Sequence, residues 1–187
     1  MHALSQLAAR GDIPAVPVYV DSPMALAARD VYRSLSVRQD LRLTSLRLVD
    51  LPNLHTTDSA QESMRLNEPR TPGIITSAPG MATGGRVVHH LMHLLPYSRH
   101  TVILTGSQVA GTRGRALAEG ATEVKMSGHY VPVRAEVVVD HGFSVHADAT
   151  DLLTWLQALP VAPERIYIVH GQPQSARSLT AKVRDET

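Results

Sequence analysis

The sequence contains no cysteine, which excludes disulfides and thiolate metal sites and leaves histidine and carboxylate side chains as candidate metal ligands. No apolar run approaches the roughly 20 residues that a helix needs to span a bilayer. The start of the chain also lacks the long apolar core of a signal peptide. A formal net charge of +1 over 187 residues means that any nucleic-acid binding has to depend on a local patch. These absences favour a soluble cytoplasmic protein with no membrane segment.

The hydrophobic pattern of the first two thirds of the chain is that of an α/β protein. Leucine and alanine at helical spacing predict a short helix over residues 3–10. Two strand–loop–helix units in a row then favour right-handed crossovers and a parallel, doubly wound sheet. Asp21 precedes Ser22-Pro23 and is interpreted as a cap or turn residue rather than a catalytic one. Strands are predicted at 15–20, 73–77 and 101–105, and helices at 23–35, 59–67, 86–95 and 117–119.

The period of the pattern changes near residue 116. Residues 122–126 and 131–139 alternate as paired antiparallel strands do, which suggests a passage from one sheet to another. A leucine-faced helix after Asp148, a strand at 165–169 and a helix at 175–184 follow. We therefore divide the chain into two domains, 1–116 and 117–187.

Two glycine-rich loops each connect a strand to a helix. Backbone N–H groups of the Ser77–Arg86 loop, brought close to a ligand by Gly80, Gly84 and Gly85, can form an anion site, and Arg86 can add a phosphate contact. The alternative is a tight turn with Thr83 as the helix cap. The second loop, Gly106–Arg115, has the same character but is not a Walker A loop, because no Lys-Ser/Thr follows its second glycine.

Three histidines, His89, His90 and His93, lie close together in the predicted helix 86–95. At about 100° per residue they point away from the apolar side of that helix. We interpret them as a polar outer face rather than as a metal site.

The stretch Gly142–Asp148 places a hydroxyl, an imidazole and a carboxylate within five residues. Asp148, three residues before Asp151, is predicted to be a helix N-cap. His146 precedes this cap and can be a general acid, a phosphate contact, a metal ligand or a structural histidine. The same alternatives hold for His170, which follows another strand-like run.

Four ordered motifs resemble one family. The motifs are ITSAPGMATGGR (75–86), GTRGR (111–115), GFSVHAD (142–148) and IVHG (168–171). They are similar to motifs of the β-CASP ribonucleases of the metallo-β-lactamase superfamily, and VYVDSPMA (18–25) resembles a strand and helix start early in the β-CASP domain. The resemblance implies a parallel β-CASP sheet followed by the carboxy-terminal strands and helices of a metallo-β-lactamase αββα domain.

The resemblance also implies roles for individual residues. His146 matches the family's catalytic histidine that contacts the scissile phosphate, and Ser144 matches its neighbouring phosphate-binding serine. His170 matches a ligand of one of two zinc ions. The Ser77–Arg86 segment resembles a loop that faces the RNA-binding cleft. On that basis we infer that six residues of the two glycine-rich loops bind substrate: Gly80, Gly84, Gly85, Arg86, Thr112 and Arg113.

The family's His-x-His-x-Asp-His zinc motif has no counterpart in these 187 residues. A lone His170 cannot hold a zinc ion that needs about four ligands, so we expect the chain by itself to bind zinc weakly and not to cleave RNA. The favoured interpretation is the RNA-cleft part of a zinc-dependent ribonuclease. The alternative is a non-catalytic nucleic-acid-binding module or inactive homologue. An uncovered apolar face after residue 116 further predicts self-association as a homodimer.

Overall fold

The computed structural model describes residues 2–37, 51, 53–143, 146–169 and 171–186, and shows a mixed α/β fold with parallel sheets. The chain forms two compact units, Met1–His141 and Gly142–Thr187. None of the described helices is long and apolar enough to cross a membrane.

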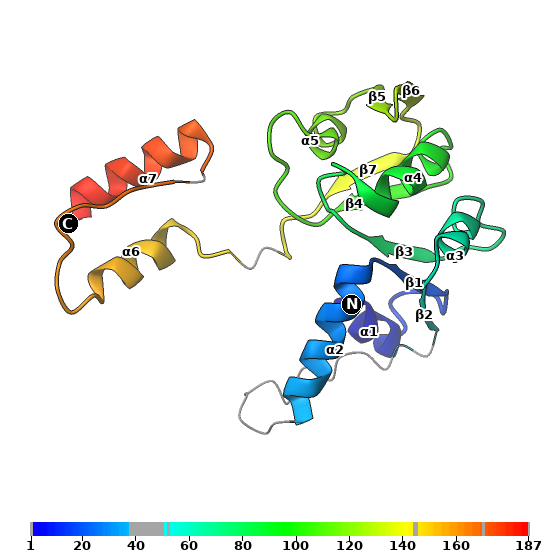
Figure 1. Ribbon diagram of the computed structural model, residues 1–187, viewed down its shortest axis with the longest axis horizontal. Helices are drawn as coiled ribbons and strands as arrows, with labels where there is room; N and C mark the ends of the chain where they lie inside the picture. Colours follow the sequence, from blue (N-terminus) through cyan, green and yellow to red (C-terminus); the bar gives the residue numbers. More distant parts are fainter. Residues whose placement is uncertain (1, 38–50, 52, 144–145, 170, 187) are drawn as a thin grey trace. The chain divides into compact units, whose positions relative to one another are not determined.

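The first unit begins with a three-stranded parallel sheet in the order β2-β1-β3 (Figure 1). β1 pairs with β3 over its whole length, from Val18 opposite Ile74 to Asp21 opposite Ser77. The carboxyl end of β1 therefore lies beside the start of the first glycine-rich loop. The elements are α1 (His2–Arg10), β1 (Val18–Asp21), α2 (Pro23–Val37), β2 (Leu54–Thr56), α3 (Ala60–Arg65) and β3 (Ile74–Ser77).

The rest of the first unit contains a second parallel pair and a hairpin. β4 pairs with β7 in parallel, and β5 pairs with β6 antiparallel. β3 and β4 therefore belong to different hydrogen-bonded sheets in the described part of the chain. The elements are α4 (Gly85–Leu94), β4 (Thr101–Leu104), α5 (Arg113–Ala118), β5 (Glu123–Met126), β6 (His129–Pro132) and β7 (Glu136–Val139).

The direction of β7 corrects the antiparallel pairing predicted for residues 131–139. Only the first part of this run, in β6, forms the hairpin. Backbone N–H groups of Arg134 and Ala135 then donate to the carbonyl of Leu95, at 2.8 and 2.9 Å, and the chain turns back to β4. Alternation shows that one face of a strand is buried, but it does not fix the direction of the partner strand.

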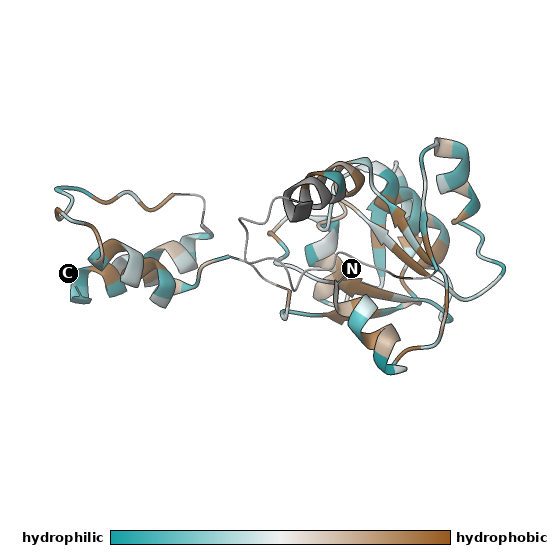
Figure 2. Ribbon diagram, turned by 90° about the horizontal axis from the view of Figure 1, so that it is seen from below, coloured by the Kyte–Doolittle hydropathy of each residue, from teal (hydrophilic) through white to brown (hydrophobic). Residues whose placement is uncertain are grey.

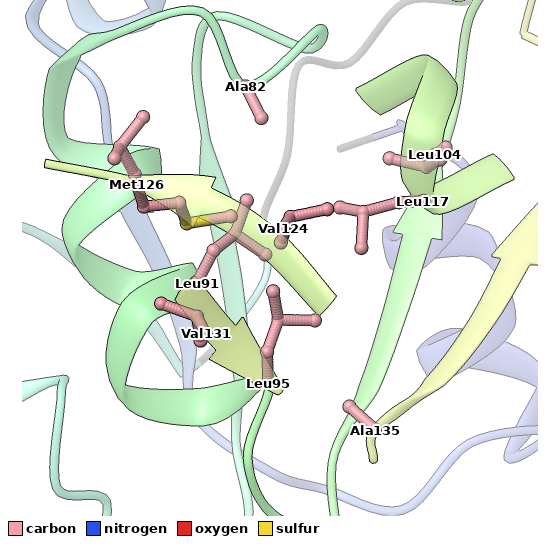
Figure 3. Packing of buried hydrophobic residues seen from close by; sticks show 10 residues of the cluster. Ala82, Leu91, Leu95, Leu104, Leu117, Val124, Met126, Val131 and Ala135 are labelled. Atoms are coloured by element: carbon pink, nitrogen blue, oxygen red, sulfur yellow. The ribbon is translucent and has the colours of Figure 1, made fainter. Parts of the chain in front are cut away.

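The main hydrophobic core lies between α4, α5 and the strands β4 to β7 (Figure 3). Leu95 and Met126 are fully buried, and Leu117 of α5 is 1% exposed. Figure 2 shows hydrophobic residues concentrated on the strands of this unit. Because α4 packs on this core while its first turn adjoins the 77–86 loop, the core fixes the helix on which that loop ends.

The second unit contains α6 (Ala149–Gln157) and α7 (Pro173–Glu186), which contact each other. The predicted helices here are confirmed, but the strand predicted at 165–169 is not formed. A strand needs a hydrogen-bonding partner, and the described residues pair none with this segment. Large side chains in this unit are exposed: Trp155, Val161, Ile166, Tyr167 and Val169.

Candidate functional site

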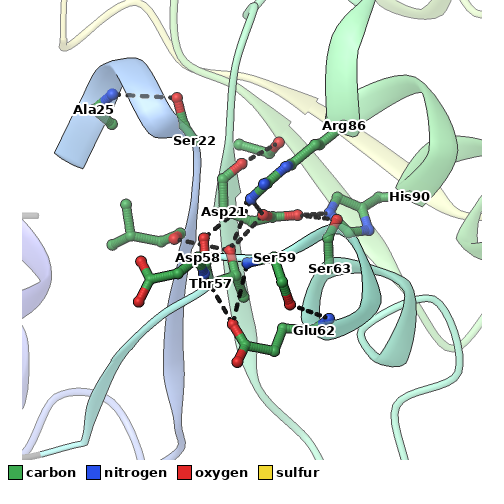
Figure 4. A network of polar contacts seen from close by, with 12 residues as sticks. Asp21, Ser22, Ala25, Thr57, Asp58, Ser59, Glu62, Ser63, Arg86 and His90 are labelled. Carbon is green, nitrogen blue, oxygen red and sulfur yellow. Dashed lines mark hydrogen bonds and ion pairs between the residues drawn. The ribbon is translucent and has the colours of Figure 1, made fainter. Parts of the chain in front are cut away.

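A fully buried carboxylate, Asp21, lies at the carboxyl end of β1 (Figure 4). It is not the cap of α2, contrary to prediction, because the Ser22 hydroxyl accepts the hydrogen bond from the N–H of Ala25 at 3.2 Å. Instead, Asp21 accepts hydrogen bonds from four side chains of the β2–α3 segment and α4: Thr57, Ser63 (2.6 Å), Arg86 (2.6 Å) and His90 (2.5 Å).

His90 is also placed differently from the prediction. It is 3% exposed, whereas His89 and His93 of the same helix are exposed as predicted. Its Nε2 faces Asp21, and its Nδ1 lies 2.8 Å from Oδ1 of the buried Asn67. Hydrophobic periodicity could not reveal this, because the partner that makes a buried histidine acceptable is 69 residues away in the sequence.

Asp21 and His90 of this cluster have shifted pKa values. Burial raises the pKa of Asp21, but hydrogen bonds from Ser63, Thr57, Arg86 and His90 outweigh it and lower the pKa to about 2. Burial lowers the pKa of His90, and the hydrogen bond and charge of Asp21 oppose that shift. Asp21 is therefore a carboxylate at neutral pH, paired with the Arg86 guanidinium.

The two glycine-rich loops are joined through backbone carbonyl groups. Four consecutive carbonyls of the first loop, Gly80 to Thr83, accept hydrogen bonds from the second loop and the first turn of α5. The donors are Gln108 Nε2 to Gly80 (3.2 Å), the Gly114 N–H to Met81 (3.0 Å), and Arg113 Nη1 to Ala82 (3.0 Å) and Thr83 (3.3 Å). Because these four carbonyls are hydrogen-bonded to the second loop and α5, the first loop is held as a turn before α4.

The first loop ends in the glycine pair that begins α4. Gly84 is the N-cap residue in an extended conformation, so the alternative of Thr83 as cap is not what the structure shows. Gly85 has φ +70°, and a Cβ there would lie 3.3 Å from the Ala78 carbonyl oxygen. A side chain at Gly85 is therefore strained, and the N–H groups at the start of α4 lie in a turn that needs glycine.

The predicted substrate-binding residues of the second loop have backbone partners. Thr112 caps α5 by accepting from the Arg115 N–H at 3.2 Å. The Arg113 Nε donates to the Lys125 carbonyl at 2.7 Å. Both residues nevertheless line an open pocket of about 580 Å³, which Thr83 and Lys125 also line.

The structure describes only some of the site residues that were predicted in the second unit. His146 is exposed, and Asp148 is confirmed as the N-cap of α6, with a capping box to Asp151. Ser144 and His170 lie outside the described residues. Among the residues that are described, no three His, Asp or Glu side chains are grouped as a metal site.

Sequence reasoning did not identify Gln108 as a structural residue of the site, and it misassigned Asp21 and His90. Gln108 is 7% exposed and its amide joins both loops, to Gly80 and, at 2.9 Å, to Gly106. A signal was present for Asp21: an aspartate that follows the buried strand Val18–Val20 is placed at a sheet edge where ligands and polar clusters gather.

Comparisons with known proteins agree with the motifs. Residues 1–117 match the family model described as Beta-Casp domain, and residues 130–187 match the model described as Zn-dependent metallo-hydrolase RNA specificity domain. The chain is 32% identical to Ribonuclease TTHA0252 of Thermus thermophilus, over 89% of this chain and 39% of that protein. It is 31% identical to an RNase J-like protein of Methanocaldococcus jannaschii, over 92% of this chain and 40% of that protein.

A third relative is a transcription termination factor, FttA of Pyrococcus horikoshii, at 29% identity over 98% of this chain and 30% of that protein. The chain thus spans between 30% and 40% of the length of these three relatives. The two family models meet between residues 117 and 130, whereas the compact units of the structure divide after His141.

Proposed function

Since the chain belongs to the β-CASP family of metallo-β-lactamase-fold ribonucleases, we propose that it provides the RNA-facing part of a zinc-dependent ribonuclease that hydrolyses RNA phosphodiester bonds. The observation that carries this proposal is the pair of family matches in order along one chain. In the whole protein the first part belongs to a doubly wound β-CASP domain, with its boundary near residue 116, and the rest completes the metallo-β-lactamase domain.

The first glycine-rich loop is proposed to hold an RNA phosphate. Its carbonyls at Gly80 to Thr83 are taken by the second loop, and a helix N-terminus with unpaired N–H groups favours an anion. Gly80, Gly84 and Gly85 allow close approach of backbone to phosphate. The Arg86 guanidinium lies beside them with its Nη1 on Asp21, so a phosphate contact would use its other N–H groups. Thr112 and Arg113 extend the same surface through the pocket that they line.

The second unit is proposed to supply the groups that act on the scissile phosphate. The exposed His146 would contact this phosphate and, with an acidic residue of the whole protein, assist protonation of the leaving group. Ser144 would be a neighbouring phosphate contact. His170 would be one zinc ligand. Zinc bound in a complete site would supply activation of a water and stabilisation of negative charge.

We propose that this chain by itself does not provide a complete zinc site. No group of three candidate ligands occurs among the described residues, and one imidazole does not satisfy an ion that takes about four ligands. We therefore propose that the 187-residue chain alone binds zinc weakly and does not cleave RNA. Stoichiometric zinc after dialysis, with metal-dependent cleavage that His146→Ala abolishes, would show the opposite.

The proposal is tested by titrating the 187-residue chain with single-stranded RNA at several salt concentrations. The affinity is expected to fall as salt rises, with a slope of roughly 0.7 per phosphate contact in a plot of log affinity against log salt. Arg99→Ala, which removes an exposed cation of the turn before β4, serves as the charge control. Affinity that does not change with salt contradicts phosphate binding.

A non-catalytic nucleic-acid-binding module or inactive homologue is the second candidate, since one relative is named a transcription termination factor rather than a ribonuclease. The two candidates differ in the whole protein: an intact His-x-His-x-Asp-His motif upstream of this region supports the ribonuclease. In either case RNA is the proposed partner and the cytoplasm the proposed location.

Self-association is proposed for the isolated chain. Trp155, Tyr167 and Val169 of the second unit are 64%, 75% and 78% exposed, and exposed apolar groups of this size favour burial against another surface. Sedimentation velocity is expected to show a homodimer whose fraction rises with concentration. A monodisperse monomer at high concentration contradicts this proposal.

A further inference from the structure

The Asp21 carboxylate is completely buried, so it cannot touch a substrate. It is nevertheless among the most heavily hydrogen-bonded groups in the described part of the chain. Oδ1 accepts from Thr57 and Arg86, and Oδ2 accepts from Ser63 and His90. All four lone-pair sites of the carboxylate are thereby used.

Two of these donors belong to one helix. Arg86 and His90 are four residues apart in α4, so they lie on the same face, one turn from each other. Both side chains reach down to Asp21 (Figure 4). Two attachments on one face fix the rotation of α4 as well as its distance from β1.

Arg86 directly follows the glycine pair Gly84-Gly85 that ends the first loop. Its Nη1 also donates to the Thr57 carbonyl at 3.0 Å, which joins α4 to the segment after β2. Just before this glycine pair, the carbonyls of Gly80 to Thr83 are held by the second loop. The N–H groups at the start of α4 thus depend on Asp21 for their position.

We propose that Asp21 is a positioning residue for the 77–86 loop, acting through Arg86 and His90. This inference rests on the proposed function, in which the loop holds an RNA phosphate. Asp21 places the phosphate-binding N–H groups against the carboxyl ends of β1 and β3. Arg86 acts first by binding Asp21 and only then by any phosphate contact of its own. Its Nη1 already donates to Asp21 and to the Thr57 carbonyl.

The direction in which one substitution changes RNA affinity separates a positioning role of Asp21 from a direct electrostatic effect. Asp21→Asn removes a negative charge near the loop, which by Coulomb's law favours binding of an anion. Positioning predicts the reverse, since the amide cannot accept from Arg86, Thr57, Ser63 and His90 together. Asp21→Asn is therefore expected to weaken RNA binding by roughly tenfold, the size of coupling common within one hydrogen-bond network.

The experiment measures affinity of the 187-residue chain for single-stranded RNA at one fixed salt concentration. His90→Leu is expected to weaken binding as Asp21→Asn does. His90→Gln is expected to retain it, because its amide N–H can replace the Nε2–H donor to Asp21. His93→Gln, at an exposed position of the same helix, is the matched control and leaves affinity unchanged.

Binding by Asp21→Asn as tight as or tighter than wild type overturns the inference. If Asp21→Asn does not fold, the two His90 variants test the inference instead. Equal RNA affinities of His90→Leu and His90→Gln overturn the inference. Hydrogen exchange gives a readout without RNA, with faster exchange expected at residues 80–88 in Asp21→Asn. If the wild type does not bind RNA, the proposed function is refuted. If hydrogen exchange at residues 80–88 is unchanged in Asp21→Asn, the positioning role is refuted.

Discussion

Asp21 and His90 make the stability of the first unit depend on pH in two separate ranges. The pKa of Asp21 is lowered in the folded protein, from 3.8 to about 2, so its contribution is present above pH 4 and is lost as pH falls towards 2. That contribution is on the order of 2 kcal/mol of unfolding free energy.

His90 acts at higher pH. Burial lowers its pKa below 6.5, so the unfolded chain takes up a proton first, and stability falls as pH drops below 6.5. Urea unfolding of wild type and His90→Gln between pH 8 and pH 3 checks this. The difference between them is expected to shrink below pH 6.5. His100, whose pKa burial also lowers, is present in both proteins and cancels.

Gly114 has a steric reason to be glycine. A Cβ at this position would lie 1.8 Å from Oε1 and 2.9 Å from Cδ of Gln108. Gly114→Ala would push the Gln108 amide off the carbonyls of Gly80 and Gly106, at a cost of about 1–3 kcal/mol in unfolding free energy.

Chemical denaturation tests the effect, with Gly106→Ala as control because its Cβ would meet nothing within 4 Å. In a Gln108→Ala background, Gly114→Ala is expected to cost less, since the closest clashing group is gone and the contact with the Met81 carbonyl carbon, at 3.1 Å, remains. Equal costs in the two backgrounds would show that the Gln108 contact is not the cause.

Local patterns predicted residues well where the partner is close in sequence. The prediction of Asp148 as N-cap follows from Asp151 three residues later. The prediction of a turn at Gly84-Gly85, where α4 begins, follows from the two adjacent glycines. The Asp21 cluster was missed because its donors come from positions 36 to 69 residues away. Whether a polar residue is buried depends on such distant partners, which periodicity does not contain.

The first turn of α6 depends on its capping box. The Asp148 side chain accepts from the N–H groups of Thr150 (2.8 Å) and Asp151 (2.9 Å), and Asp151 accepts from the Asp148 N–H in return. Asp148→Ala is expected to destabilise this helix by about 1 kcal/mol, and Asp148→Ser by less.

Hydrogen exchange at residues 149–153 measures this change. The capping box of α3, formed by Ser59 and Glu62, lies in the other unit and provides an internal reference that should not respond. An equal increase of exchange at both helices would indicate a global effect rather than loss of a cap.

Strand positions were predicted better than strand partners. The runs that became β3, β4 and β5 were located within one or two residues, because alternating or continuous apolar residues mark them directly. The partner of β7 could not be found in this way, since β4 lies more than 30 residues earlier. Residues 165–169 have the composition of a strand, but the described chain pairs no strand with them.

The whole first unit is expected to fold without the second. It extends to His141 and contains the main core together with the β4–β7 pair. A chain of residues 1–141 should unfold cooperatively in urea and retain the low pKa of Asp21. A chain of residues 1–117 should not, because it lacks Val124, Met126 and Val131 of the core. Circular dichroism with urea distinguishes the two outcomes.

The return of β7 to β4 also limits how such a protein can be assembled by gene rearrangement. A recombination junction between residues 117 and 130, where the two family matches meet, would join β4 of one parent to β7 of another. The two strands face each other over four residue pairs, from Thr101–Glu136 to Leu104–Val139. Chimeras joined after residue 141 inherit both strands from one parent, and should therefore survive in larger numbers when libraries of related sequences are shuffled.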